Sequence, residues 1–228
     1  MSQLMNKTLL LILLYAFPTL SPTFNQGTNQ KEINRINIYP LGNHKVDFRL
    51  IRPDKLDNRN RLCVPGAFTS KNNTPEGLIY LNGKLTSGQK PSSGKGLVII
   101  SLGEIEILNI NQLGQFLNSR KDSRFSLFQQ WYLIENNRKG ENPFSNSKLQ
   151  MRVIAKIKNE TFIIESDSNI ESEYFISTLI KMGVSDAIYL DMGSWSEGWY
   201  KDGNNTIKSI GNNKSNTNRQ TNWLLFHD

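Results

Sequence analysis

The chain has 228 residues, of which 37% are hydrophobic and 21% are charged. These proportions are those of an ordinary globular protein, so they exclude a wholly disordered chain, and the length suits about one domain. The formal net charge of +7 favours polyanionic partners. Lys and Arg are scattered, however, with no run of five and no nucleic-acid-binding motif, so we expect no nucleic-acid partner and leave association with an anionic cell envelope open.

The first 22 residues have the pattern of an export signal. Lys7 precedes the apolar residues 8–17, a stretch that is short for a bilayer span but has the length of a signal h-region. No clean small-x-small cleavage triplet follows, so an uncleaved N-terminal anchor is the alternative to a cleaved signal peptide. We expect an exported protein that is periplasmic or secreted, or is held at a membrane by its N-terminus.

Short strands dominate the expected secondary structure, because apolar residues alternate or run in short blocks. In chain order the expected strands cover residues 33–39, 46–51, 61–65, 77–81, 97–100, 104–108, 131–135, 151–157, 161–165 and 223–226. Asn82-Gly83 is a strong hairpin signal, and a second hairpin is expected around residues 101–103. Residues 111–120 predict a short helix with Leu113, Phe116 and Leu117 on one face.

A crossover unit is expected in the second half of the chain. After the strand 161–165, a helix with an apolar stripe begins near Ser168 or Ser172 and ends at Gly183. The strand 187–190 then returns parallel to the first, which brings its end to the sheet edge that holds Glu165. Residues 202–222 are rich in Asn, Ser, Lys and Gly and predict a long mobile loop.

These elements predict an α+β fold, with one domain of strand-rich mixed sheets, a βαβ crossover and few helices. The expected organisation is a signal peptide or anchor over residues 1–22, N-terminal strands over 23–60, and a main domain over 61–228 that forms one globular unit with those strands.

Asp191 is the main candidate for chemistry. It follows a short apolar strand directly, and Met192-Gly193-Ser194 then break that strand in a turn where backbone amides approach an anion closely. An acid at the C-terminal end of a strand is a common place for catalysis.

The cysteine and the histidines exclude other kinds of site. Cys63 is the only cysteine and lies between Leu62 and Val64, so no disulfide can form within the chain and a buried thiol is expected. His44 and His227 lie far apart in sequence without partners at ligand spacing, which indicates neither a zinc site nor a Ser-His-Asp triad.

Five segments, in this order, resemble the phosphodiester glycosidase family. They are CVPGAFTSKNNTPEGLIYLNGK, QQWYLIENNRKG, MRVIAKIKNETFIIESD, FISTLIKMGVSDAIYLDMGSWSEGWY and NRQTNWLLF. The family's Leu-Asp-Gly-Gly-Gly-Ser element falls on residues 190–195, where Met192 and Ser194 replace two glycines. Its Asn-Gly-Gly-Phe-Phe element falls on residues 64–69, without the Asn, and its strand-opening Arg falls on Arg152.

The resemblance implies an exported hydrolase that cleaves a glycosyl-1-phosphodiester bond of a carbohydrate or sugar-phosphate substrate. Arg152 is expected to grip the phosphate through its planar guanidinium, and Asp191 to act at the anomeric carbon as nucleophile, base or cation stabiliser. These two side chains are therefore expected to share one cleft. The expected substrate-binding residues are Thr69, Gln129, Gly193, Ser194, Trp195, Arg219 and Asn222.

Several alternatives stay open. Glu76 and Glu197 are candidates for a second acid, while Trp199 and Tyr200 either stack on a sugar or pack below a loop. No cofactor and no metal site are expected, with a divalent cation left open because carboxylates near a phosphate can hold one. The alternative to an enzyme is a non-catalytic glycan-binding or envelope-associated protein on the same scaffold.

Overall fold

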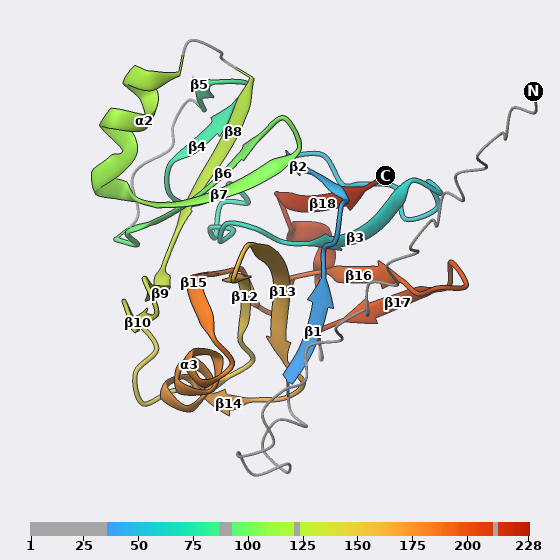
Figure 1. The fold of residues 1–228 in the computed structure, drawn as a ribbon. Helices are drawn as coiled ribbons and strands as arrows, with labels where there is room; N and C mark the ends of the chain where they lie inside the picture. The colour runs from blue at the N-terminus through green and yellow to red at the C-terminus, as the bar shows by residue number, and fades with distance from the viewer. Residues whose placement is uncertain (1–35, 87–92, 121–123, 212–213) are drawn as a thin grey trace, which may run out of the picture.

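A computed structural model describes residues 36–86, 93–120, 124–211 and 214–228 of the chain. Within these ranges the strands form three large antiparallel sheets and one two-stranded sheet, accompanied by two α-helices (Figure 1). The predicted α+β class is confirmed. The expected export segment over 1–22 and the first residues of the predicted strand 33–39 lie outside the described residues.

The six-stranded sheet carries the candidate site. Its strands, in spatial order, are β1 (Ile36–Pro40), β13 (Glu160–Ser166), β12 (Arg152–Ile157), β15 (Val184–Tyr189), β9 (Tyr132–Glu135) and β10 (Arg138–Lys139). Both β13 and β15 pair with β12 in antiparallel orientation, so they are parallel to each other. The predicted parallel return is therefore confirmed, with β12 inserted between the two strands.

Helix α3 (Ser172–Lys181) makes the crossover and covers one face of this sheet. It begins at Ser172, with Glu171 as N-cap residue, so the capping spacing at Ser168 does not start it. Phe175, Ile176 and Leu179 are buried against β12 and β15. Because the opposite face of the sheet is also covered, by the central core, β12 and β15 appear in the sequence as continuous apolar runs.

Two five-stranded sheets pack against that opposite face. One has the order β17 (Ile207–Ile210), β16 (Gly198–Lys201), β3 (Asn60–Val64), β18 (Trp223–His227) and β2 (Lys45–Arg49). The other has the order β5 (Lys84–Leu85), β4 (Ile79–Leu81), β8 (Phe125–Gln130), β6 (Gly96–Ser101) and β7 (Glu104–Asn109). One buried cluster joins all three sheets, and it includes Phe48, Phe128, Ile154 and Leu224.

Both predicted hairpins are confirmed. Tyr80 pairs with Leu85 across Asn82-Gly83, and Ile100 pairs with Ile105. The helix predicted over 111–120 forms as a 3₁₀ turn, η1 (Ile110–Gln112), followed by α2 (Leu113–Ser119). Strand β8 was not predicted.

The predicted long loop over 202–222 is wrong in part. Strand β17 forms there and pairs with β16 around a turn in which Asp202 Oδ1 accepts hydrogen bonds from the amides of Asn204 and Thr206. A second 3₁₀ turn, η2 (Thr217–Arg219), precedes β18. Sequence reasoning missed β17 because two of its four side chains are exposed and polar, so it lacks the alternation that marks a half-buried strand.

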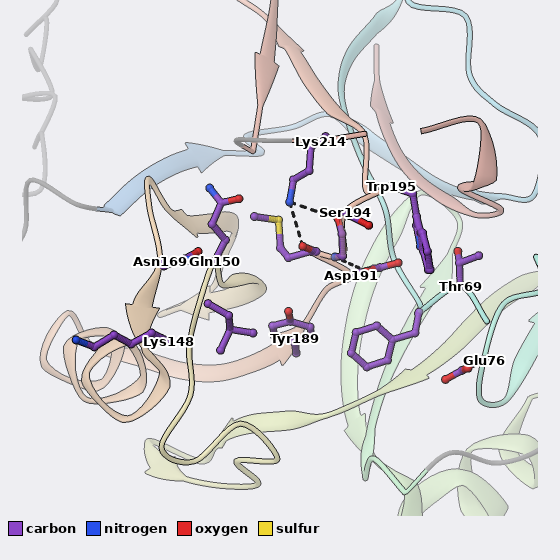
Figure 2. A pocket seen from close by; sticks show the side chains of 14 residues that line it. Thr69, Glu76, Lys148, Gln150, Asn169, Tyr189, Asp191, Ser194, Trp195 and Lys214 are labelled. Atoms are coloured by element: carbon purple, nitrogen blue, oxygen red, sulfur yellow. Dashed lines mark hydrogen bonds between the residues drawn. The ribbon is translucent and has the colours of Figure 1, made fainter. Parts of the chain in front are cut away.

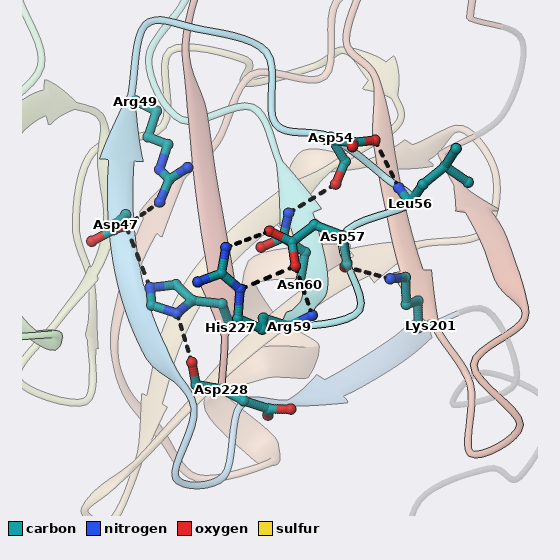
Figure 3. A network of polar contacts seen from close by, with 10 residues as sticks. All are labelled: Asp47, Arg49, Asp54, Leu56, Asp57, Arg59, Asn60, Lys201, His227 and Asp228. Carbon is teal, nitrogen blue, oxygen red and sulfur yellow. Dashed lines mark hydrogen bonds and ion pairs between the residues drawn. The ribbon is translucent and has the colours of Figure 1, made fainter.

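A network of hydrogen bonds and ion pairs stabilises the β2–β3 connection and the C-terminal strand β18 (Figure 3). Asp57 pairs with Arg59 at 2.7 Å, and Lys201 Nζ donates to the Asp57 carbonyl at 2.7 Å. His227 Nε2 lies 3.3 Å from an oxygen of Asp47. In the part of the chain that the structure describes, no helix combines the length and apolarity needed to cross a membrane.

Candidate active site

A cavity of about 520 Å³ lies at the end of the six-stranded sheet where β12 begins and β15 ends (Figure 2). Its lining comes from the segment after β3, from β11 (Lys148–Leu149) and the residue after it, from the β13–β14 connection before β14 (Ile170–Glu171), from the end of β15 and the turn after it, and from the β17–β18 connection. The lining residues are Phe68, Thr69, Glu76, Lys148, Leu149, Gln150, Asn169, Tyr189, Asp191, Met192, Gly193, Ser194, Trp195 and Lys214.

Asp191 is held in this cavity wall by backbone hydrogen bonds. Its amide donates to the Gly66 carbonyl at 3.0 Å, and the preceding amide of Leu190 donates to the Arg152 carbonyl at 2.9 Å. The side chain is only 2% exposed. Oδ1 accepts a hydrogen bond from the Gly193 amide at 2.8 Å, whereas the buried Oδ2 has no hydrogen-bond partner among the described residues. One carboxylate oxygen is thus fixed by a hydrogen bond, and the other makes none, although the Thr69 amide lies close enough to the carboxylate to lower its pKa.

Burial raises the pKa of Asp191 above its ordinary value. The amides of Gly193 and Thr69 and the positive charges of Arg152 and Lys214 oppose this rise without cancelling it. A carboxylate whose pKa is raised in this way is a stronger base than an exposed Asp, so the geometry and the protonation behaviour both suit proton transfer.

Lys214 lies over the turn that follows Asp191, as Figure 2 shows. Its Nζ donates to the carbonyls of Met192 at 3.0 Å and Gly193 at 3.4 Å. Burial, followed by the nearby charge of Arg152, lowers the pKa of Lys214 to about 8. The pKa values of Asp191 and Lys214 therefore both move toward the neutral forms, because burial outweighs the mutual attraction of the two charges.

Arg152 does not line the cavity. Its Nε donates to Glu165 Oε2 at 2.8 Å and its Nη2 lies 2.7 Å from the same oxygen, with both side chains almost fully buried. Nη1 contacts Ser196 Oγ at 3.4 Å, and that hydroxyl donates to the Asp191 carbonyl at 2.9 Å. The expected neighbours Arg152 and Asp191 are therefore linked, but only Asp191 reaches the cavity.

Two glycines enclose the Arg152 guanidinium. A Cβ added at Gly198 or Gly211 would lie 3.0 Å from Nη2, and Gly211 also has a φ of +78°. Gly211 in addition donates its amide to Glu165 Oε1 at 3.0 Å. The guanidinium is paired with Glu165 and supports the turn at Asp191, while its buried Nη2 makes no hydrogen bond among the described residues. The direct grip of Arg152 on a phosphate stays a prediction.

Four of the predicted substrate-binding residues line the cavity: Thr69, Gly193, Ser194 and Trp195. The guanidinium of Arg219 stacks over the Trp195 ring with 4.3 Å between its Cζ and the ring centroid. Arg219 also donates to Asn73 and to the Lys71 carbonyl, each at 2.9 Å. Arg219 therefore packs against Trp195, which lines the cavity, but does not line the cavity itself.

Asn222 and Gln129 do not line the cavity and are hydrogen-bonded to the backbone. Asn222 Oδ1 accepts from the amides of Gly66 and Ala67 at 3.2 and 2.8 Å, and Nδ2 donates to the Ala67 carbonyl at 2.9 Å. Gln129 Oε1 accepts from the Leu78 amide at 3.1 Å. These contacts indicate that Asn222 and Gln129 hold the backbone near the cavity in place.

The two candidates for a second acid, and the aromatic residues that could stack on a sugar, differ in whether they line the cavity. Glu76 lines the cavity, whereas Glu197 is paired with Arg52 and Lys55 and does not. Trp199 is 2% exposed in a core cluster with Cys63, and the Tyr200 ring packs on Tyr39 with 5.2 Å between centroids. Trp195 is thus the tryptophan that faces the cavity.

Sequence reasoning missed Lys214 and the residues at the other end of the cavity, Lys148, Gln150 and Asn169. Lys214 lies in a polar stretch without periodicity, so only its folded position reveals it. Lys148 and Gln150 lie shortly before β12, which begins at Arg152, and this nearness in sequence to a predicted site residue could have identified them. Within the described ranges, no group of three His, Cys, Asp or Glu residues could hold a metal ion.

Comparisons with known proteins identify similar folds. The catalytic domain of zebrafish N-acetylglucosamine-1-phosphodiester alpha-N-acetylglucosaminidase, auto-inhibited by its pro-peptide, matches with a TM-score of 0.54 and 12% identity, over 86% of this chain and 74% of that chain. A hypothetical protein from Synechocystis matches with a TM-score of 0.53 and 13% identity, over 85% of this chain and 57% of that chain. No family model matches the sequence, and neither does any curated protein sequence. At these identities the likeness establishes a shared fold.

Proposed function

We propose that the chain is a hydrolase that cleaves a glycosyl-1-phosphodiester bond. The observation that carries the proposal is the buried Asp191 carboxylate in a cavity wall, with one oxygen fixed by an amide and the other without a partner. Trp195 in the same cavity offers an aromatic face to a sugar ring, and Lys214 offers a cation to an anion. The zebrafish neighbour, a glycosidase that by its name acts on a phosphodiester-linked sugar, supports this substrate class.

In this mechanism Asp191 works on the sugar side of the bond. As a base it takes a proton from water while the water oxygen bonds to the anomeric carbon. The bond from that carbon to the phosphate oxygen breaks, and its electron pair leaves with the phosphate. Because the leaving group is a phosphate monoester, which is stable as an anion, this step needs no strong general acid, and a second carboxylate is dispensable.

Asp191→Asn tests the assigned role. Asn keeps an oxygen that accepts the Gly193 amide but cannot take a proton, so sugar release should fall about 10²–10⁴-fold. The substrates are methyl phosphodiesters of N-acetylglucosamine, glucose, galactose and mannose 1-phosphates, with the released sugar identified by mass spectrometry. Asp54→Asn is the matched control, because Asp54 is exposed and caps a turn at the Leu56 amide, a contact that Asn preserves.

The outcomes separate the proposal from its alternatives. Sugar release by Asp191→Asn at the wild-type rate would rule out the assigned role. Tight binding of these diesters by the wild-type chain without turnover would favour the non-catalytic glycan-binding alternative. In ¹⁸O-labelled water, label in the sugar supports glycosidase chemistry, whereas label in the phosphate would indicate cleavage at phosphorus.

A further inference from the structure

The cavity has chemically different ends on either side of Asp191. Figure 2 shows Thr69, Trp195 and Glu76 on one side, and Lys148, Gln150 and Asn169 on the other. The first side combines ring faces with hydroxyl and carboxylate groups, which suit a sugar. The second side is polar, and Lys148 brings a positive charge to it.

Lys214 is the cation nearest to the functional turn that also lines the cavity. An ammonium has three N–H donors, and the two carbonyls of Met192 and Gly193 account for two of them. No carboxylate among the described residues lies within ion-pairing distance of Nζ. A half-buried cation without an anionic partner has both a donor and a charge to offer to a ligand.

Arg152 differs from Lys214 in its ion pairing and in its position relative to the cavity, although its Nη2 also lacks a hydrogen-bond partner among the described residues. Its guanidinium is fully buried, is paired with Glu165 and does not line the cavity. A phosphate that enters the cavity meets Lys214, which lines it, and does not meet Arg152, which does not.

We propose that Lys214 is the residue that binds the phosphate group of the ligand. The inference rests on the proposed function for its substrate class, but the anion site itself is testable without turnover. A phosphate oxygen takes the third N–H of Nζ, and the bound anion supplies the negative charge that the half-buried ammonium lacks. The sugar on that phosphate then extends past Asp191 toward Trp195.

The experiment measures binding of inorganic phosphate by isothermal titration calorimetry at constant ionic strength. Loss of a charge-assisted hydrogen bond in Lys214→Gln should weaken phosphate binding about 10- to 100-fold, and Lys214→Arg should restore most of the affinity. Lys208→Gln is the matched control, because Lys208 is exposed on the neighbouring strand β17 and does not line the cavity. Circular dichroism checks that every variant is folded.

A second measurement uses the unmodified chain. Arg152, Glu165 and Asp191 are the charged groups that act on Lys214, and burial keeps its pKa at about 8 in the free protein. Phosphate affinity should therefore fall as the pH rises above about 8, since binding then requires proton uptake. Lys214→Arg should abolish this fall, because Arg stays protonated.

Each outcome has one meaning. Unchanged phosphate affinity in Lys214→Gln, or no measurable phosphate binding by the wild-type chain, overturns the proposal whatever the result for sugar release. If Lys214→Gln loses phosphate binding but no diester is hydrolysed by the wild-type chain, the anion site stands and the proposed hydrolysis fails.

Discussion

Asp191 carries two features that disfavour folding when its carboxylate is charged. The group is buried, and Oδ2 has no hydrogen-bond partner among the described residues. Burying an ionised carboxylate without full hydrogen bonding destabilises a protein, and such arrangements concentrate at functional sites. A substitution at Asp191 should therefore change the free energy of unfolding of the chain as well as its activity.

At the residue scale we expect Asp191→Asn to be at least as stable as the wild-type chain at pH 7. The pKa of Asp191 is raised by folding, so the protonated form favours the native state, and this contribution is lost as the pH rises from the unfolded-state pKa of about 4 through the folded-state pKa. Asn removes the buried charge. Thermal unfolding at pH 7 and below pH 4 checks this: the advantage of Asn should shrink in acid. A clear loss of stability at pH 7, absent from Asp54→Asn, would contradict it.

At the scale of elements, the site depends on a connection between β18 and the turn after β3. Asn222 precedes β18 and binds the backbone of Gly66 and Ala67, and the Gly66 carbonyl in turn accepts the Asp191 amide. A Cβ at Gly66 would lie 3.2 Å from Asn222 Oδ1, so the turn approaches the side chain closely. Three segments far apart in sequence thus hold Asp191 in place.

Asn222→Ala should lower both stability and sugar release. It leaves two buried amides and one carbonyl without their side-chain partner, at about 1–3 kcal/mol for each buried group that stays unsatisfied. Chemical denaturation measures the loss of stability, and the assay with glycosyl phosphodiesters measures activity. Asn118→Ala, at an exposed position of α2, is the control. Wild-type stability of Asn222→Ala would exclude this positioning role.

At the scale of the whole molecule, the core holds the fold without a disulfide. Cys63 is the only cysteine and is fully buried in the middle of a sheet, where it packs with Trp199, Trp223 and Leu225. Burial raises the pKa of its thiol well above the usual range. Both effects make the thiol unreactive while the sheet is intact.

Cys63 should therefore react with a thiol reagent only when the domain opens. We expect negligible labelling by 5,5′-dithiobis(2-nitrobenzoate) in native buffer and complete labelling in concentrated guanidinium chloride. Ser209→Cys places a thiol at an exposed position of β17 and should label rapidly without denaturant. Native labelling of Cys63 at a similar rate would show that the sheet opens locally.

The export segment expected over residues 1–22 stays a prediction.

The sequence by itself determined the elements whose signals are local. Asn82-Gly83 predicts its hairpin from turn chemistry, and the apolar stripe of α3 predicts its buried face. The position of Asp191 at the end of a buried strand followed from the same kind of pattern. A short polar strand such as β17 gave no such signal, because its pairing with β16 depends on backbone hydrogen bonds that any side chain permits.

Only the tertiary structure decided which charged groups face the cavity. The family resemblance predicts Arg152 as a phosphate ligand, and the register of β12 and β13 places it opposite Glu165, with which it forms a buried ion pair. Lys214 has no local pattern and reaches the turn at Asp191 because the β16–β17 hairpin folds back beside it. Burial and ion pairing depend on contacts between distant segments, which residue order alone does not contain.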